Sequence, residues 1–343
     1  MSRPITIKEI AKLADVSIGT VDRVLHNRGR VAEATRDKVL QIAKEGNYSS
    51  NVYARNLKLN KTYRIGAILP EGLSYWRKQW EGMQLGIQEQ EAMGFSIKEY
   101  ALEKGGLSLD AMKEILDDEL DGIVIAPHLL SEEGSVLELL KESQIPYVFV
   151  DVNLVDGGNL AFIGQDAFQS GLLAGSLLDR GFDEDYELFI VTSHTKDLTN
   201  EAIKARIAGL QSYYAQHSYA CIHEVNFERD GLDIQKLIHR FSSRNLPIHV
   251  FVPSSRSYVI GEELKDWKKQ LKLRFLGYDL IDQNVALMNE GVIDYLIHQK
   301  PRTQGYLAIQ TLYKHLVMKM EIVEKQFMPI EIVKRENLKY CDY

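Results

Sequence analysis

The chain has 343 residues, of which 45% are hydrophobic and 26% are charged, values typical of a globular protein with two or three folding units. Its two cysteines, Cys221 and Cys341, belong to no paired Cys or Cys/His motif, which argues against a structural zinc site and a disulfide framework and suits a reducing cytosol. The sequence has no run of about 18 apolar residues that would span a membrane, and its N-terminus lacks the apolar run of a signal peptide. We therefore expect a cytoplasmic protein without a bound metal or cofactor.

The charge is distributed unevenly along the chain. Residues 1–62 hold 12 Lys and Arg against 6 Asp and Glu, a net charge of +6, whereas the remainder holds 29 against 42, a net charge of −13. A basic head on an acidic body indicates that only the head meets a polyanion such as DNA. The alternative is a chance cluster of basic residues.

The head contains the patterns of three short helices. The capping box "TIKE" at 6–9 begins the first helix, and Ser17 is placed to cap the second. The third is expected from Glu33 to Glu45, followed by Gly46 as a left-handed cap. The side chains expected to face inward recur at helical spacing: Ile7, Ile10, Ala11, Ala14, Val21, Val24, Leu25, Val39, Leu40, Ile42 and Ala43.

Two short helices joined by a tight turn form a helix-turn-helix, whose second helix enters the major groove of DNA. Arg23 lies on the polar side of the second helix, where it could donate two hydrogen bonds to a guanine edge. Ser17 and Thr20 suit phosphate oxygens. The alternative is a three-helix packing module that does not bind DNA.

Residues 5–58, "ITIKEIAKLADVSIGTVDRVLHNRGRVAEATRDKVLQIAKEGNYSSNVYARNLK", resemble the DNA-binding head of the lactose-repressor (LacI/GalR) family along their whole length. The resemblance implies base reading by Ile18, Gly19 and Arg23, and a hinge helix whose Leu57 enters the minor groove. It implies a DNA-contact set of Thr6, Ser17, Ile18, Gly19, Thr20, Asp22, Arg23, His26, Asn27, Tyr53, Arg55, Leu57 and Lys58.

The hinge segment at 51–60, "NVYARNLKLN", is too short to form a stable helix alone, so we expect it to fold when two copies pack together on DNA. An ordinary linker is the alternative. The head departs from the family at Asp22, His26 and Ser50, which replace serine, asparagine and proline, and Gly19 provides no base-reading side chain. These changes leave the operator sequence open.

From residue 63 onward, strand-like apolar runs alternate with amphipathic helical stretches, a pattern typical of parallel sheets built from βαβ units. Ligands of such folds bind beyond the carboxyl ends of the strands. Several predicted strands end in polar residues, among them Asp151 and Asp279, which could accept hydrogen bonds from hydroxyl groups or could simply cap helices.

The body resembles the periplasmic-binding-protein-like sensor of the same family. The resemblance implies an aromatic wall at Tyr75 and Trp76, hydroxyl-binding Asp151 and Asp279, and Gln299 at the lobe crossover. Asn200 or Lys204 falls near the family's ligand arginine, for which we expect no counterpart. Lys204 and Arg256 either favour a carboxylate or phosphate on the ligand or are surface charges. The candidate ligand residues are Tyr75, Trp76, His128, Asp151, Asn153, Asn200, Lys204, Ser255, Arg256, Asp279 and Gln299.

The predicted organisation is a helix-turn-helix domain at 1–50, a hinge at 51–62 and an α/β two-lobed sensor at 63–343. Its N-lobe is expected at about 63–164 and 298–326, and its C-lobe at about 165–297 and 327–343. The last residues, "ENLKYCDY", contain no heptads, so we expect a homodimer that binds a near-palindromic operator.

The predicted function is transcriptional regulation, with repression favoured, of carbohydrate-metabolism genes under the control of a sugar or sugar derivative. A purine or organic-acid effector is the first alternative. The second is a hydrolase that uses Asp151 and Asp279 as an acid/base pair, although the sequence contains no Walker, HExxH, GxSxG or GxGxxG motif.

Overall fold

The computed structural model divides the chain into two compact units, residues 1–60 and 61–343, and each is considered by itself. The structure describes residues 5–25, 28–46, 61–72, 74–102, 106–130, 134–181, 184–194, 197, 200–216, 220–226, 246–268, 270 and 272–341. Within these ranges, no helix is long and apolar enough to cross a bilayer.

The first unit packs three helices, α1 (Ile7–Ala14), α2 (Ile18–Leu25) and α3 (Glu33–Glu45), around one small core. The predicted capping box is present: Glu9 N donates to Thr6 Oγ1 over 3.3 Å, and Thr6 N donates to Glu9 Oε2 over 2.8 Å. Two donors at the start of α1 are thereby satisfied.

Two expectations for α3 are wrong. Leu40 is 46% exposed, because the side of α3 that faces the core is set by Val39 and Ala43, one helical turn apart. Gly46 has a φ of −82° and is not left-handed. It lies against Ile5 instead: a Cβ on Gly46 would stand 2.3 Å from Ile5 Cγ2. The glycine is needed there for close approach.

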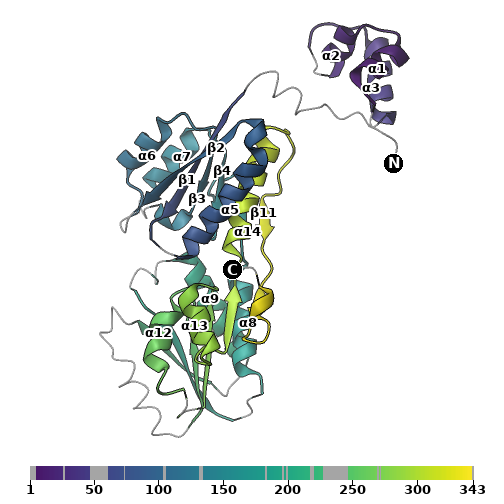
Figure 1. Ribbon diagram of the computed structural model, residues 1–343. Coiled ribbons are helices and arrows are strands. Elements are labelled where there is room, and N and C mark those ends of the chain that lie inside the picture. Colours follow the sequence, from purple (N-terminus) through teal and green to yellow (C-terminus); the bar gives the residue numbers. More distant parts are fainter. Residues whose placement is uncertain are drawn as a thin grey trace. The chain divides into compact units, whose positions relative to one another are not determined.

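The second unit contains two six-stranded sheets (Figure 1). The first has the strand order β11-β5-β4-β3-β1-β2 and the second β12-β10-β9-β8-β6-β7. All pairs are parallel except β10 with β12. The strands of the first sheet are β1 (Tyr63–Pro70), β2 (Phe95–Leu102), β3 (Gly122–Ile125), β4 (Tyr147–Val150), β5 (Ala161–Gly164) and β11 (Lys325–Phe327). Those of the second are β6 (Tyr186–Thr192), β7 (Ala220–Asn226), β8 (Ile248–Phe251), β9 (Leu273–Tyr278), β10 (Tyr295–His298) and β12 (Glu331–Val333).

Helices cover both faces of each sheet, as expected for buried parallel strands (Figure 1). The helices of the first lobe are α5 (Ser74–Gln90), α6 (Leu109–Leu116), α7 (Ser135–Glu142) and α14 (Pro301–Leu316), with 3-10 turns η1 (Glu91–Met93) and η2 (Pro127–Leu129). Those of the second lobe are α8 (Ala167–Asp179), α9 (Glu201–Tyr214), α12 (Ser257–Leu264) and α13 (Asp282–Asn289), with η4 (Leu338–Tyr340). The chain enters the second lobe after β5, returns after β10 into α14, and passes over again between β11 and β12.

Glycines allow one pair of helices in each lobe to approach closely. A Cβ on Gly82 of α5 would lie 1.8 Å from the carbonyl oxygen of Arg302 in α14. A Cβ on Gly171 of α8 would lie 1.9 Å from the carbonyl oxygen of Arg206 in α9. Both contacts leave no room for a side chain, so the glycines fix the distance between the helices that carry the inner walls of the site described next.

Candidate ligand cleft and nucleic-acid interface

A cleft of about 740 Å³ lies between the carboxyl ends of the strands of the two lobes. Its volume falls within the range of small-molecule sites. It brings together every residue that the sequence predicts for ligand contact, namely Tyr75, Trp76, His128, Asp151, Asn153, Asn200, Lys204, Ser255, Arg256, Asp279 and Gln299. Their role as ligand contacts stays a prediction.

The wall provided by the first lobe is aromatic. The Trp76 ring lies 5.1 Å from the His128 ring at an interplanar angle of 35°, and Tyr75 meets Trp76 edge-on at 5.0 Å. The Tyr75 hydroxyl donates to Asp151 Oδ1 over 2.9 Å. Burial, together with Asp151 and Asp279, raises the pKa of Tyr75 well above its usual value, and burial lowers the pKa of His128. The side chains of Tyr75 and His128 are therefore neutral at pH 7, and their rings can pack against an apolar face of a ligand.

Asp151 and Asp279 occupy equivalent places in the two lobes. Each follows a strand with a left-handed φ, 71° and 68°, and each donates its backbone N–H to the neighbouring strand, at Ile163 O and Ile297 O. No helix begins at either residue: β5 follows Asp151, and the cap of α13 is Ile281. The interpretation of these aspartates as helix caps is therefore wrong.

Asp279 is buried, with 1% of its surface exposed. Gln299 Nε2 donates to Asp279 Oδ2 over 2.8 Å, and Gln299 N donates to Oδ1 over 3.4 Å. Burial raises the pKa of Asp279 to about 7, against the opposing effects of Arg206 and Gln299. The carboxyl group is thus partly protonated near pH 7.

Arg206 is a buried arginine that lines the cleft, where the sequence was expected to provide no counterpart of the family's ligand arginine. It is 4% exposed, its guanidinium lies 4.2 Å above the Tyr278 ring, Nη1 donates to Pro253 O over 2.9 Å, and Nη2 donates to Gln299 Oε1. The family resemblance had placed Asn200 or Lys204 near this position. The available clue was an arginine on the apolar face of α9, one turn from Ala202 and Ile203.

Asn200 and Lys204 have local partners instead. Asn200 Oδ1 accepts from the backbone N–H groups of Ala202 and Ile203 and so caps α9. Lys204 Nζ lies 2.7 Å from Glu201 Oε1, and both side chains are about half exposed. The charge of Lys204 is therefore compensated at the rim of the cleft.

A second set of residues that the sequence did not predict links the two aspartates through glutamine side chains. Gln304 Nε2 donates to Gln299 O over 2.8 Å, while Gln304 Oε1 accepts from Gln79 Nε2 over 2.9 Å and from Asp151 N over 3.2 Å. Gln79 and Gln304 have no exposed surface. Their clue in the sequence was a glutamine on the buried face of each helix, beside the glycines that let α5 and α14 approach.

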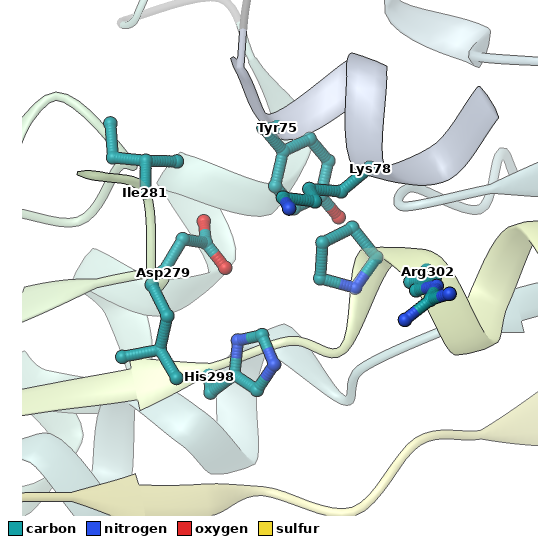
Figure 2. Close-up of a pocket in the computed structure, with 8 residues that line it drawn as sticks. Tyr75, Lys78, Asp279, Ile281, His298 and Arg302 are labelled. Atoms are coloured by element: carbon teal, nitrogen blue, oxygen red, sulfur yellow. The ribbon is translucent and has the colours of Figure 1, made fainter. Parts of the chain in front are cut away.

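A small cavity of about 10 Å³, room for one water molecule, lies behind Asp279. Figure 2 shows the Asp279 carboxylate and the Tyr75 hydroxyl directed into the same space, with His298 and Arg302 on its other sides. Tyr75 lies on α5 and Arg302 on α14, both in the first lobe, whereas His298 lies on β10 in the second lobe. The two lobes therefore meet at this cavity.

The pKa of Asp279 predicts a pH-dependent stability. The folded-state pKa of about 7 exceeds the unfolded value of 3.8, so the folded state binds more protons between these values and its free energy of unfolding falls as pH rises through this window. The loss reaches up to about 4 kcal/mol for the fully ionised group. In urea unfolding without ligand, the stability of Asp279→Asn relative to the wild type should rise between about pH 4 and about pH 8. An offset that is constant with pH would contradict the shift.

The exposed side of α2 carries the predicted DNA contacts. Ile18 is 51% exposed, Gly19 and Arg23 are also exposed, and Arg23 Nε donates to Gly19 O over 3.1 Å. Thr20 N donates to Ser17 Oγ over 3.1 Å, which caps the helix as predicted. Six predicted contacts lie outside the described residues: His26, Asn27, Tyr53, Arg55, Leu57 and Lys58.

Arg23→Ala should relax specificity at one base pair of the operator by about 1–3 kcal/mol, since the bidentate contact to guanine predicted for Arg23 would be lost. Selection of bound sequences from a randomised DNA pool measures this directly. Lys12→Ala, at the exposed end of α1, is the control that removes one positive charge elsewhere in the unit. An unchanged base preference in Arg23→Ala would refute the assignment.

The second lobe also groups a carboxylate, a thiol and an imidazole that the sequence analysis did not expect to meet. Ligand atoms of Glu187 on β6 and of Cys221 and His223 on β7 all lie within 4.8 Å of one another. Glu187 pairs with Cys221 in the strand register, and its Oε2 lies 2.7 Å from His223 Nε2. The absence of a sequence motif therefore did not exclude a Cys/His cluster in space.

A three-helix unit with a helix-turn-helix, joined to a two-lobed unit with a ligand cleft, defines the class of DNA-binding regulators that carry a sensor domain. Comparisons agree with this class. Residues 6–51 match the profile of bacterial regulatory proteins of the lacI family, and residues 66–320 match a periplasmic binding protein domain. The chain therefore combines a lacI-family DNA-binding domain with a periplasmic binding protein domain, and it is a DNA-binding transcriptional regulator with an effector-binding domain.

The relatives are regulators, not enzymes. The HTH-type transcriptional repressor PurR of Vibrio parahaemolyticus is 29% identical over 97% of this chain and 98% of its own length. The sucrose operon repressor of Staphylococcus xylosus is 26% identical over 68% of this chain and 71% of its own length. A structure assigned to the LacI transcriptional regulators, from Bacteroides fragilis, has a TM-score of 0.74 at 27% identity and covers 82% of this chain and 100% of its own. A solute binding protein from Burkholderia graminis in complex with D-arabinose has a TM-score of 0.71 at 17% identity over 82% of this chain and 99% of its own, and shares the fold.

Proposed function

We propose that the protein is a repressor of carbohydrate-metabolism genes, and that a sugar or sugar derivative in the cleft controls its affinity for a near-palindromic operator. One observation carries the proposal: Asp151 and Asp279, one from each lobe, line the same cavity as the Trp76 ring. Carboxylates accept hydrogen bonds from hydroxyl groups, and an aromatic ring packs against the C–H face of a sugar ring.

The same arrangement explains how a ligand would act. A molecule that contacts both aspartates bridges the lobes, and it shifts the population toward the lobe arrangement that it binds more tightly. In a homodimer this shift would change the spacing of the two heads, which must match half-sites about one helical turn apart. The sucrose operon repressor among the relatives supports the carbohydrate assignment. Binding to an operator implies a cytoplasmic location.

The direct test is thermal unfolding of the full-length protein against a panel of monosaccharides, disaccharides, sugar acids, sugar phosphates and purine bases. A ligand present at 100 times its dissociation constant stabilises the folded state by about 2.7 kcal/mol. We expect at least one carbohydrate to stabilise the wild type and to lose this effect in Asp151→Asn. Stabilisation by purines alone, or by no carbohydrate, would contradict the proposal.

A further inference from the structure

The charges of the cleft are not evenly paired. Lys204 is compensated by Glu201 at 2.7 Å, and the Tyr75 hydroxyl donates to Asp151. Arg206 and Asp279 both hydrogen-bond the Gln299 side chain, and Arg206 lowers the pKa of Asp279. After these pairings, Arg256 is the cationic side chain of the cleft that has no acidic partner among the described residues.

Arg256 lies at the end of the connection from β8 to α12 and lines the cleft beside Ser254 and Ser255. Its Nη1 is buried without a hydrogen-bond partner in the described part of the chain, and the guanidinium has no ion pair with a described carboxylate. Burial lowers the pKa of Arg256, as expected for a cation that lacks a counter-charge. An unpaired buried donor is costly unless a ligand accepts from it.

Arg206 provides an independent observation at the same strand end. Its Nη1 donates to Pro253 O, three residues before Arg256. Arg206 lines the cleft and is only 4% exposed. Its Nε is buried and has no hydrogen-bond partner among the described residues. Helix α12 begins at Ser257 with no side-chain cap, so its N-terminus adds partial positive charge next to Arg256, the residue that precedes it.

Resting on the proposed function, we infer that the effector is an acidic sugar. A carboxylate or phosphate of the ligand is held by Arg256 and Arg206 at the start of α12, and its hydroxyl groups meet Asp151 and Asp279. A guanidinium binds a carboxylate or phosphate through two parallel hydrogen bonds, which a neutral hydroxyl group cannot supply. The aromatic wall at Trp76 receives the ring of the sugar.

Calorimetric titration of the full-length protein tests this with matched sets of ligands: D-glucose, D-glucuronate and D-glucose 6-phosphate, and the corresponding galactose series. We expect one acidic member to bind at least about tenfold more tightly than its neutral parent, since a charge-assisted pair adds roughly this factor. Carboxylate and phosphate are distinguished by which acid is preferred.

Variants of Arg256 test whether this residue is responsible for the preference for acidic sugars. Arg256→Gln should remove the preference for the acid, so that the acidic and the neutral sugar bind with affinities within about threefold of each other. Arg256→Lys should retain part of it, because the charge remains while the paired donors are lost. Arg77→Gln, an exposed arginine of α5 outside the cleft, should behave as the wild type.

The outcomes separate this inference from the proposed function. A wild type that prefers neutral sugars, or a preference for acids that persists in Arg256→Gln, would overturn the inference while a sugar effector remained established. Failure of every sugar and sugar acid to bind would contradict the proposed function together with the inference.

Discussion

Asp279→Asn is expected to need about 10–150 times more effector than the wild type before its affinity for operator DNA changes. The carboxylate is buried beside Gln299 and Arg206, and it lines the cleft from the second lobe. An amide presents one acceptor in place of two and cannot ionise, so above about pH 8, where Asp279 is charged, the effector should lose the strength of a charge-assisted hydrogen bond, about 1.5–3 kcal/mol or about 10–150-fold in affinity. Fluorescence anisotropy of labelled operator measures the response.

The matched control is Asp282→Asn, an exposed aspartate three residues later at the start of α13. It should retain the response of the wild type. If Asp279→Asn instead lost operator binding in the absence of effector, the residue would be required for the folded architecture and its assignment to the ligand would be wrong.

Gly82→Val is expected to destabilise the sensor unit by about 3 kcal/mol or more. Its Cβ would stand 1.8 Å from the carbonyl oxygen of Arg302, so α5 and α14 would have to separate. That separation would also break the hydrogen bond between Gln79 and Gln304, which connects the two helices behind the cleft. Urea unfolding monitored by tryptophan fluorescence and by circular dichroism measures the loss.

Gln84→Val is the control for the helix propensity of valine, because Gln84 lies on the exposed side of the same helix. It should cost well under 1 kcal/mol. Equal unfolding midpoints for the two variants would show that the contact between α5 and α14 adapts to a side chain, contrary to the geometry.

The features that could be predicted from the sequence are local. The capping box at Thr6 is complete within four residues, and the bounds expected for α3, Glu33 to Glu45, match those of the structure. The polar strand ends were found because parallel strands direct their carboxyl ends to one edge of a sheet, whatever the distance between them in the chain. This is why the strand-end candidates His128, Asp151, Asn153, Ser255, Arg256 and Asp279 lie at the cleft, whereas Tyr75, Trp76, Asn200, Lys204 and Gln299 were predicted from the family resemblance.

The features that the sequence could not supply depend on contacts between distant segments. Gln79 and Gln304 are 225 residues apart and meet only because glycines bring α5 and α14 together. Arg206 was missed for a related reason: its burial is set by Tyr278 and Gln299, on elements far along the chain. Leu40 was placed inward because an apolar residue next to a core position satisfies the helical pattern almost as well as the core position itself.

The central claim is that a ligand in the cleft and DNA at the head are energetically coupled, and thermodynamic linkage provides its most direct test. Effector affinity should be measured by calorimetry on the full-length protein with and without saturating operator. The account predicts that the two affinities differ by the same factor by which the effector changes operator affinity, about 5–150-fold. An effector affinity that is identical in the free and the operator-bound protein would contradict the account.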